Sequence, residues 1–157
     1  MMKPLLNRGK TPWLCLALAG VPLPGLAAAI GITLQQHLVF GRFAPTASAG
    51  SVTISTAGGR TGSNVALISG AYAQAIFKVT GDADATYSIT LPALDTVLLA
   101  SGTNTMMVQQ FRSTPATTGT LDANGQQLLH IGATLEVGSN QARGDYSATF
   151  DITVEYQ

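Results

Sequence analysis

Hydrophobic residues recur at every second position through most of the chain beyond its N-terminal segment. This period is typical of β-strands that bury one face, because successive side chains of a strand point to opposite sides. The two clearest runs, 128–137 and 146–156, lie near the C-terminus. In the first run one face carries Leu129, Ile131, Ala133, Leu135 and Val137. The pattern predicts that both segments are strands.

Shorter alternating runs, separated by clusters of Gly, Ser, Thr, Asn and Pro, predict further strands and turns. The runs lie at 52–54, 75–79 and 87–91, with weaker candidates at 65–68, 97–99 and 106–111. The turn clusters lie at 56–63, 81–84, 101–104 and 113–119, and Asn124–Gly125 is the best hairpin signal. No amphipathic helix competes, so we expect an all-β fold, an antiparallel two-sheet immunoglobulin-like sandwich that is either complete or lacks one strand.

The first 29 residues have the pattern of a secretory signal peptide. Lys3, Arg8 and Lys10 form a basic start, residues 13–21 are apolar, and Ala27–Ala29 end the segment with small residues. Prolines interrupt the apolar run well before the roughly 20 residues that a membrane helix needs. We therefore predict cleavage after Ala29, general secretory export, and a secreted protein that passes through the periplasm to the cell surface or the medium.

Removal of residues 1–29 changes the charge and the cysteine content. It takes away three of the eight basic residues and none of the eight acidic ones, which leaves a net charge of −3. It also removes Cys15, the one cysteine, so the mature chain has neither a disulfide nor a thiol nucleophile. We expect no membrane span in the mature chain, and no nucleic-acid partner because its basic residues are few and scattered.

The sequence offers little for enzyme chemistry. His37 and His130 are the two histidines available for a hydrolase triad, and His130 falls on the polar face of a predicted strand. Asp82 and Asp84 could contribute to a calcium site, and Asp122–Gly125 resembles part of an EF-hand loop, but turns explain both better. We expect a non-enzymatic protein with no cofactor or metal.

The C-terminal run combines three features. Its last residue but one is Tyr156, Gly144 is the fourteenth residue counted back from the end, and apolar residues alternate between them. This ending is similar to the C-terminal strand of chaperone-usher pilin subunits, above all the archaic, spore-coat-U-like ones. The resemblance assigns a groove-forming and chaperone-contacting strand to Gly144, Tyr146, Ala148, Phe150, Ile152, Val154 and Tyr156.

A wider likeness covers nearly all of residues 38–156. The segments LVFG (38–41), FKVTG (77–81), YSITLP (87–92) and IGATL (131–135), together with the ending, resemble a bacterial secreted family known as domain of unknown function 4402. Joined with the pilin-like ending, this likeness favours a fimbrial role. It implies a sandwich whose core stays open along a groove until a strand of the next subunit fills it.

Directly after the predicted cleavage site, Ile30, Ile32 and Leu34 alternate with polar or small residues. This segment could be the donated strand, so we divide the mature chain into an N-terminal extension or donor strand, residues 30–37, and a sandwich domain, residues 38–157. The expected function is a structural subunit of a secreted fimbria or surface fibre. Its implied partners are other copies of itself or related subunits, a periplasmic chaperone and an outer-membrane usher.

The same residues also allow a self-complete sandwich. Residues 30–43 can be its first strand and the C-terminal run an ordinary interior strand, because alternation is typical of any half-buried strand. The protein would then be a secreted domain that binds a small ligand or a glycan through its loops.

Overall fold

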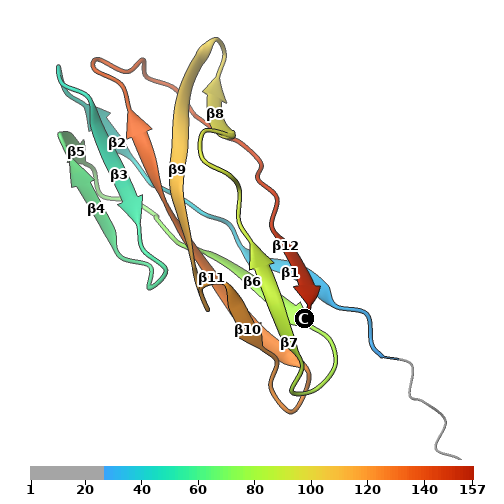
Figure 1. Ribbon diagram of the computed structural model, residues 1–157. Helices are drawn as coiled ribbons and strands as arrows, with labels where there is room; N and C mark the ends of the chain where they lie inside the picture. Colours follow the sequence, from blue (N-terminus) through green and yellow to red (C-terminus); the bar gives the residue numbers. More distant parts are fainter. Residues whose placement is uncertain (1–26) are drawn as a thin grey trace, which may run out of the picture.

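The computed structural model describes residues 27–157. This part of the chain forms twelve strands and no helix, so it has no helix that could span a membrane. The molecule is elongated, and β1 begins at the same end at which the chain terminates (Figure 1). The signal-peptide prediction falls outside the described residues, apart from Ala27–Ala29.

Seven strands form the larger sheet, which is built around the long strand β11 (Gln126–Val137). β6 pairs with the first half of β11 and β3 with the second half, while β9 pairs along the other edge. The remaining strands lie outside these. The bounds are β1 (Gly31–Gln36), β3 (Gly50–Ile54), β4 (Arg60–Ser63), β6 (Ala75–Thr80), β8 (Val97–Ser101) and β9 (Asn104–Thr114).

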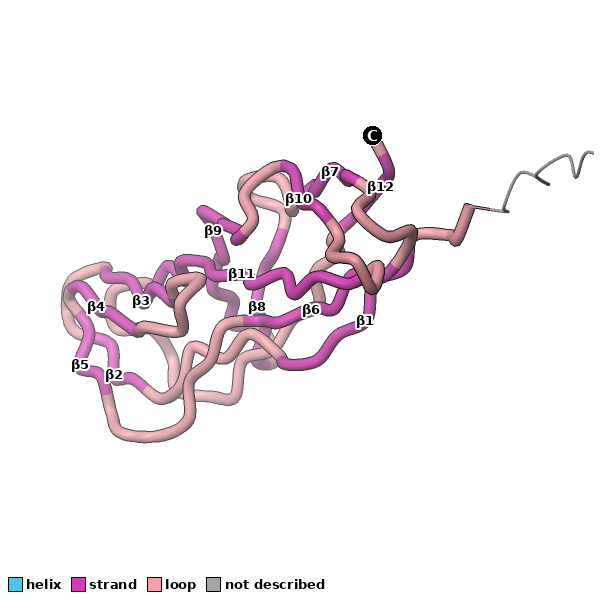
Figure 2. Tube along the Cα trace, turned by 90° about the horizontal axis from the view of Figure 1, so that it is seen from below, coloured by secondary structure: helices cyan, strands magenta, loops and turns pink. Residues whose placement is uncertain are grey.

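Two smaller sheets complete the fold. The order β10-β7-β12 joins Thr118–Thr120, Thr86–Thr90 and Thr153–Tyr156, and β2 (Phe43–Pro45) pairs with β5 (Val65–Leu67). All of these pairings are antiparallel. The three-stranded sheet lies over one half of the larger sheet, as the two layers in Figure 2 show. The predicted all-β antiparallel sandwich is therefore confirmed.

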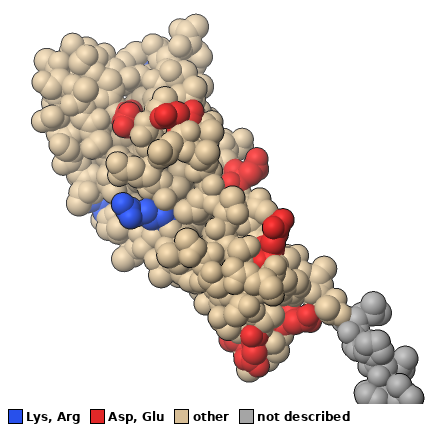
Figure 3. Space-filling model, viewed as in Figure 1, with Lys and Arg blue, Asp and Glu red and all other residues tan. Residues whose placement is uncertain are grey.

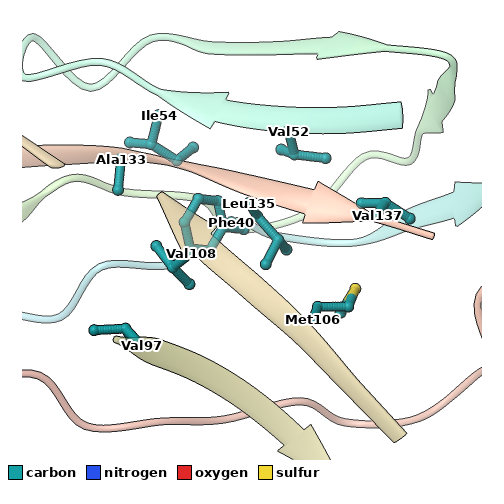
Figure 4. Packing of buried hydrophobic residues seen from close by; sticks show 9 residues of the cluster. All are labelled: Phe40, Val52, Ile54, Val97, Met106, Val108, Ala133, Leu135 and Val137. Atoms are coloured by element: carbon teal, nitrogen blue, oxygen red, sulfur yellow. The ribbon is translucent and has the colours of Figure 1, made fainter. Parts of the chain in front are cut away.

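The core divides into two clusters, each named here for how it is covered. The closed half lies between the larger sheet and the three-stranded sheet, and its buried residues are Ala75, Val79, Tyr87, Ile89, Leu121, Leu129 and Ile131. The open half lies at the other end of β11 (Figure 4), with Phe40, Val52, Ile54, Val97, Met106, Val108, Ala133, Leu135 and Val137. Over the open half, the described residues form no three-stranded sheet, although Phe43 of β2 and Val65 of β5 pack against its core.

β11 agrees with the sequence pattern. Leu129, Ile131, Ala133 and Leu135 are all at most 2% exposed, whereas the alternate residue Leu128 is 50% exposed. β11 supplies buried residues to both clusters, so this strand belongs to both halves of the core.

Three expectations need correction. The C-terminal run is hydrogen-bonded as a strand only over Thr153–Tyr156, because residues 144–152 have one isolated bridge, between Ser147 and Ala100. Asp122–Gly125 is a turn with Gly125 at φ 68°, but it is no hairpin, since β10 and β11 belong to different sheets. Residues 60–63, expected within a turn, form β4 by pairing with β3.

Candidate functional site

The open half contains an apolar groove of about 1040 Å³. Its two walls are extended segments, residues 37–45 on one side and residues 141–148 on the other. Its floor belongs to the core of the open half and comes from β8, β9 and β11, with Val97, Leu99, Met106, Val108 and Leu135. The groove thus lies where a further strand of the second layer would have to run.

The N-terminal wall continues the ladder of β1. Gln36 pairs with Ile76, and in the same register Val39 exchanges two hydrogen bonds with Ala73, at 2.8 and 2.9 Å. Backbone groups of successive residues in an extended chain point to opposite sides. Since Val39 turns toward Ala73, the adjacent Leu38 turns its N–H and C=O the other way, toward the groove.

Arg60 fixes the shape of this wall. Its guanidinium donates to the carbonyls of Phe40 (3.4 Å), Arg42 (3.3 Å) and Ile68 (2.9 Å). It also lies over the ring of Tyr72, 4.6 Å from the centroid. The wall bends at Gly41, whose φ of 78° favours glycine. These contacts fix the wall through the carbonyls of Phe40 and Arg42, while the backbone groups of Leu38 have no hydrogen-bond partner among the described residues.

The C-terminal wall is paired on its outer edge alone. Ser147 exchanges backbone hydrogen bonds with Ala100 of β8, and it is the one residue between 142 and 152 of this described segment with such a bond. Tyr146 and Ala148, on either side of it, therefore direct their backbone groups toward the groove. Both walls line the same groove and include residues, Leu38 in one and Tyr146 and Ala148 in the other, whose backbone groups have no hydrogen-bond partner among the described residues.

Two side chains brace the start of the C-terminal wall. The Tyr146 hydroxyl donates to the Ala142 carbonyl at 2.8 Å, and the Gln141 amide donates to Tyr146 and to the Thr105 carbonyl at 2.9 and 3.1 Å. Gly144 packs so closely on Ser101 of β8 that a side chain at this position would collide with it. The wall is thereby fixed without a continuous strand ladder.

The predicted C-terminal set divides between the two halves. Gly144, Tyr146, Ala148 and Phe150 line the groove. Ile152, Val154 and Tyr156 pack instead against the core of the closed half. Phe150 lies at the junction, with its ring centroid 5.1 Å from that of Phe111 and 6.4 Å from that of Phe77.

The predicted donor residues lie in β1, which pairs with β6 of the same chain. Ile30 and Ile32 are half-buried against the closed half, and Leu34 is 42% exposed. Donation to a neighbour stays a prediction, and it would require β1 to leave β6.

The other polar candidates do not come together. His37 is exposed at the rim of the groove, whereas His130 lies on β11 with its Nδ1 3.5 Å from the Gln74 amide. Asp122 accepts hydrogen bonds from backbone amides of its own turn. No group of three potential metal ligands occurs among residues 27–157. Acidic and basic side chains are thinly spread over the visible face (Figure 3).

The sequence patterns missed the N-terminal wall and the floor as parts of one site. Leu38 and Phe40 alternate, which indicated a strand but not that the strand would lie beside an empty place. One signal in the sequence could have indicated the groove. No further alternating segment remains that could form a strand between residues 37–45 and residues 141–148.

Residues 30–156 match a family model described as Domain of unknown function (DUF4402). The chain belongs to this family. The match begins at the residue that follows the predicted cleavage site and covers both walls of the groove. No curated protein and no solved structure matches the chain.

Proposed function

We propose that this DUF4402 protein is a non-enzymatic structural subunit of a secreted fimbria or surface fibre, and that its groove accepts an extended strand from a neighbouring copy or a related subunit. The observation that carries the proposal is the pair of groove walls, in which the backbone groups of Leu38, Tyr146 and Ala148 have no partner among the described residues, above an apolar floor. A strand placed between them could hydrogen-bond on both sides and bury alternate side chains below.

The dimensions of the donor segment suit this groove. A wall of nine residues extends about 30 Å, and the seven residues 30–36 extend about 23 Å, at roughly 3.3 Å per residue. Alternate residues Ile30, Ile32 and Leu34 would point toward the floor. Each fully buried side chain of this kind contributes about 1.5–3 kcal/mol.

The present position of β1 leaves room for a gain on exchange. β1 is an edge strand with four exposed residues out of six, and it pairs on one side only. In a groove the same segment would pair on two sides and bury Leu34. Transfer from its own β6 to a neighbour's groove is therefore expected to be favourable once β1 is released.

The donor strand and the groove lie toward opposite ends of the molecule, which favours a head-to-tail chain of copies over a closed dimer. β1 starts at the end where the C-terminus lies, and the groove extends toward the end that carries β2 (Figure 1). A donor at one end and an acceptor toward the other form a head-to-tail contact, which generates filaments when the rotation does not close. Before assembly, an exposed groove calls for a periplasmic chaperone, and an outer-membrane usher would be the site of assembly.

Leu34→Asp tests the donor role. Leu34 is already partly exposed in β1, so the subunit should still fold, but an aspartate cannot enter an apolar groove without a partner. We expect fibre or oligomer formation, followed by light scattering, to fall at least tenfold. Thr33→Asp is the matched control, because Thr33 is an exposed neighbour on the other face of the strand. Assembly of the Leu34→Asp protein at the normal rate would refute donation of this segment.

The size and apolar floor of the groove also favour a second candidate, a secreted domain that binds a small apolar ligand. The volume of about 1040 Å³ is at the upper end of small-molecule sites. In that case the protein would stay monomeric, and Leu34→Asp would change neither its oligomeric state nor its ligand binding.

A further inference from the structure

The penultimate tyrosine has a hydrogen-bonding role that its position in the pilin-like ending does not predict. Its hydroxyl donates to the carbonyl of Ala28 at 2.7 Å and accepts from the backbone N–H of Asp82 at 2.8 Å. The Asp82 carboxylate in turn accepts from the backbone N–H of Ala28 at 2.7 Å. Ala28 is thus bonded through both of its backbone groups.

These three residues, Ala28, Asp82 and Tyr156, form what we call the N-terminal latch. It ties the residues just before β1 to the turn after β6 and to the last strand, β12. The pocket around the hydroxyl is tight, because any side chain at Gly81 would collide with it. The remaining contacts that hold β1 are one edge ladder, the partial burial of Ile30 and Ile32, and a hydrogen bond from the Gln36 amide to the Gln74 carbonyl at 2.9 Å.

The position of Ala28 gives the latch a consequence. It precedes the predicted cleavage site after Ala29, so processing would remove the one latch residue that belongs to the N-terminal segment. We propose that the N-terminal latch holds β1 on its own subunit as long as residue 28 is attached, and that cleavage between Ala29 and Ile30 releases the start of β1 for donation. This regulation rests on the proposed function, whereas the latch itself does not.

The loss of Ala28 has an effect large enough to measure. It removes two hydrogen bonds, one of them to a carboxylate, which is the stronger kind. Their loss should therefore raise the local opening of β1 about tenfold, since 1.4 kcal/mol corresponds to a factor of ten.

A double-mutant cycle isolates this effect. Two proteins are compared, one that starts at Ala27 and contains all described strands, and one that starts at Ile30. Each is made as wild type and as Tyr156→Phe, which removes the hydroxyl and keeps the ring. Tyr146→Phe, which removes a hydroxyl bonded at the groove instead, is the matched control.

The readout is amide hydrogen exchange of residues 31–36, with β11 as the internal reference. We expect exchange in β1 to be about tenfold faster in the Ile30 protein than in the Ala27 protein. Tyr156→Phe should accelerate it in the Ala27 protein and leave it unchanged in the Ile30 protein, while Tyr146→Phe should change it in neither. Equal β1 exchange in all four proteins, or an equal effect of Tyr156→Phe in both backgrounds, would overturn the latch.

Light scattering of the same samples separates the two proposals. Faster β1 exchange together with faster oligomer growth in the Ile30 protein supports release for donation. Faster β1 exchange in a protein that stays monomeric at all concentrations keeps the latch and overturns its role in assembly.

Discussion

The two halves of the sandwich share the strand β11 but differ in what covers it. In the closed half, the sheet β10-β7-β12 lies over Leu129 and Ile131, and Tyr87 is completely buried between the layers. In the open half, Leu135 and Val108 are equally inaccessible to solvent, yet they form the floor of a groove between two incompletely paired walls. Burial of individual residues therefore does not distinguish a finished core from an unfinished one.

What distinguishes the halves is the pairing of their edges. β12 pairs with β7 over four residues, whereas its continuation toward the groove has a single bridge to β8. In the closed half, the layer opposite β11 is a hydrogen-bonded sheet of the same chain. In the open half, the segments that line the groove have a single bridge on one side and backbone groups without a partner, and this difference is the basis of the proposal that one more strand completes it.

The largest expected effect compares two leucines of the same strand. Leu129→Ala should lower the free energy of unfolding by about 3–5 kcal/mol, because it leaves a cavity in a covered core. Leu135→Ala should cost at least about 1 kcal/mol less, since the neighbouring walls are free to move into the space. Urea unfolding of both proteins measures this, with the exposed Leu128→Ala as a control that should stay within about 0.5 kcal/mol of wild type. Equal losses at 129 and 135 would mean that the open half is as rigidly covered as the closed half.

A medium effect is expected at the junction of the halves. Phe150 is half-buried, lines the groove, and packs against Phe111 and Phe77. Phe150→Ala should therefore lower stability by about 1.5–3 kcal/mol, less than the removal of a fully buried phenylalanine. Thermal unfolding gives the value, and Phe150→Leu, which keeps most of the apolar contact, should recover more than half of the loss. A negligible effect would show that the C-terminal wall does not pack on the core.

The smallest effect concerns pH and the closed half alone. Burial raises the pKa of the Tyr87 phenol above its ordinary value of 10, and its hydroxyl donates to the Gln127 side chain at 2.7 Å. The unfolded chain therefore loses this proton first, and the contribution of Tyr87 to stability is present below pH 10 and is lost as the pH rises further.

Tyr87→Phe should be about 1 kcal/mol less stable than wild type at pH 8, because it lacks this hydrogen bond. The gap between the two proteins should narrow above pH 10, as measured by urea unfolding at a series of pH values. Tyr146→Phe, which removes a tyrosine hydroxyl bonded at the groove and not in the closed half, is the control. A gap that stays constant up to pH 11 would contradict a buried, protonated phenol at position 87.

Much of the fold follows from the period of the apolar residues. β11 and the odd-even phase of the C-terminal run could be predicted, because burial on one face leaves a direct trace in the sequence. The extent of β12 could not, since hydrogen bonding also needs a neighbour, and residues 144–152 have an apolar phase but little to pair with. β4 was missed for the converse reason: Arg60–Ser63 has few apolar residues and is a strand through its pairing with β3.

Only part of the candidate site could be predicted from the sequence. The C-terminal wall with Gly144, Tyr146 and Ala148, and Phe150 beyond it, was indicated by the resemblance to pilin endings. The latch was not predicted, because the contact between Tyr156 and Ala28 joins residues 128 positions apart in the sequence and depends on how the two layers are placed. The pairing of the donor segment with β6 likewise depends on which edge of the larger sheet is free.

The central claim is that the open half is completed by one additional strand. Its most direct test is size-exclusion chromatography with light scattering on the protein that starts at Ile30, beside the same protein with a second copy of residues 30–36 attached after Gln157 through a flexible linker long enough to reach from the C-terminus back to the groove. The account predicts a concentration-dependent series of oligomers for the first protein and a more stable monomer for the second, because the attached strand fills the groove. Two monomers of equal stability would contradict it and would leave a self-complete secreted binding domain.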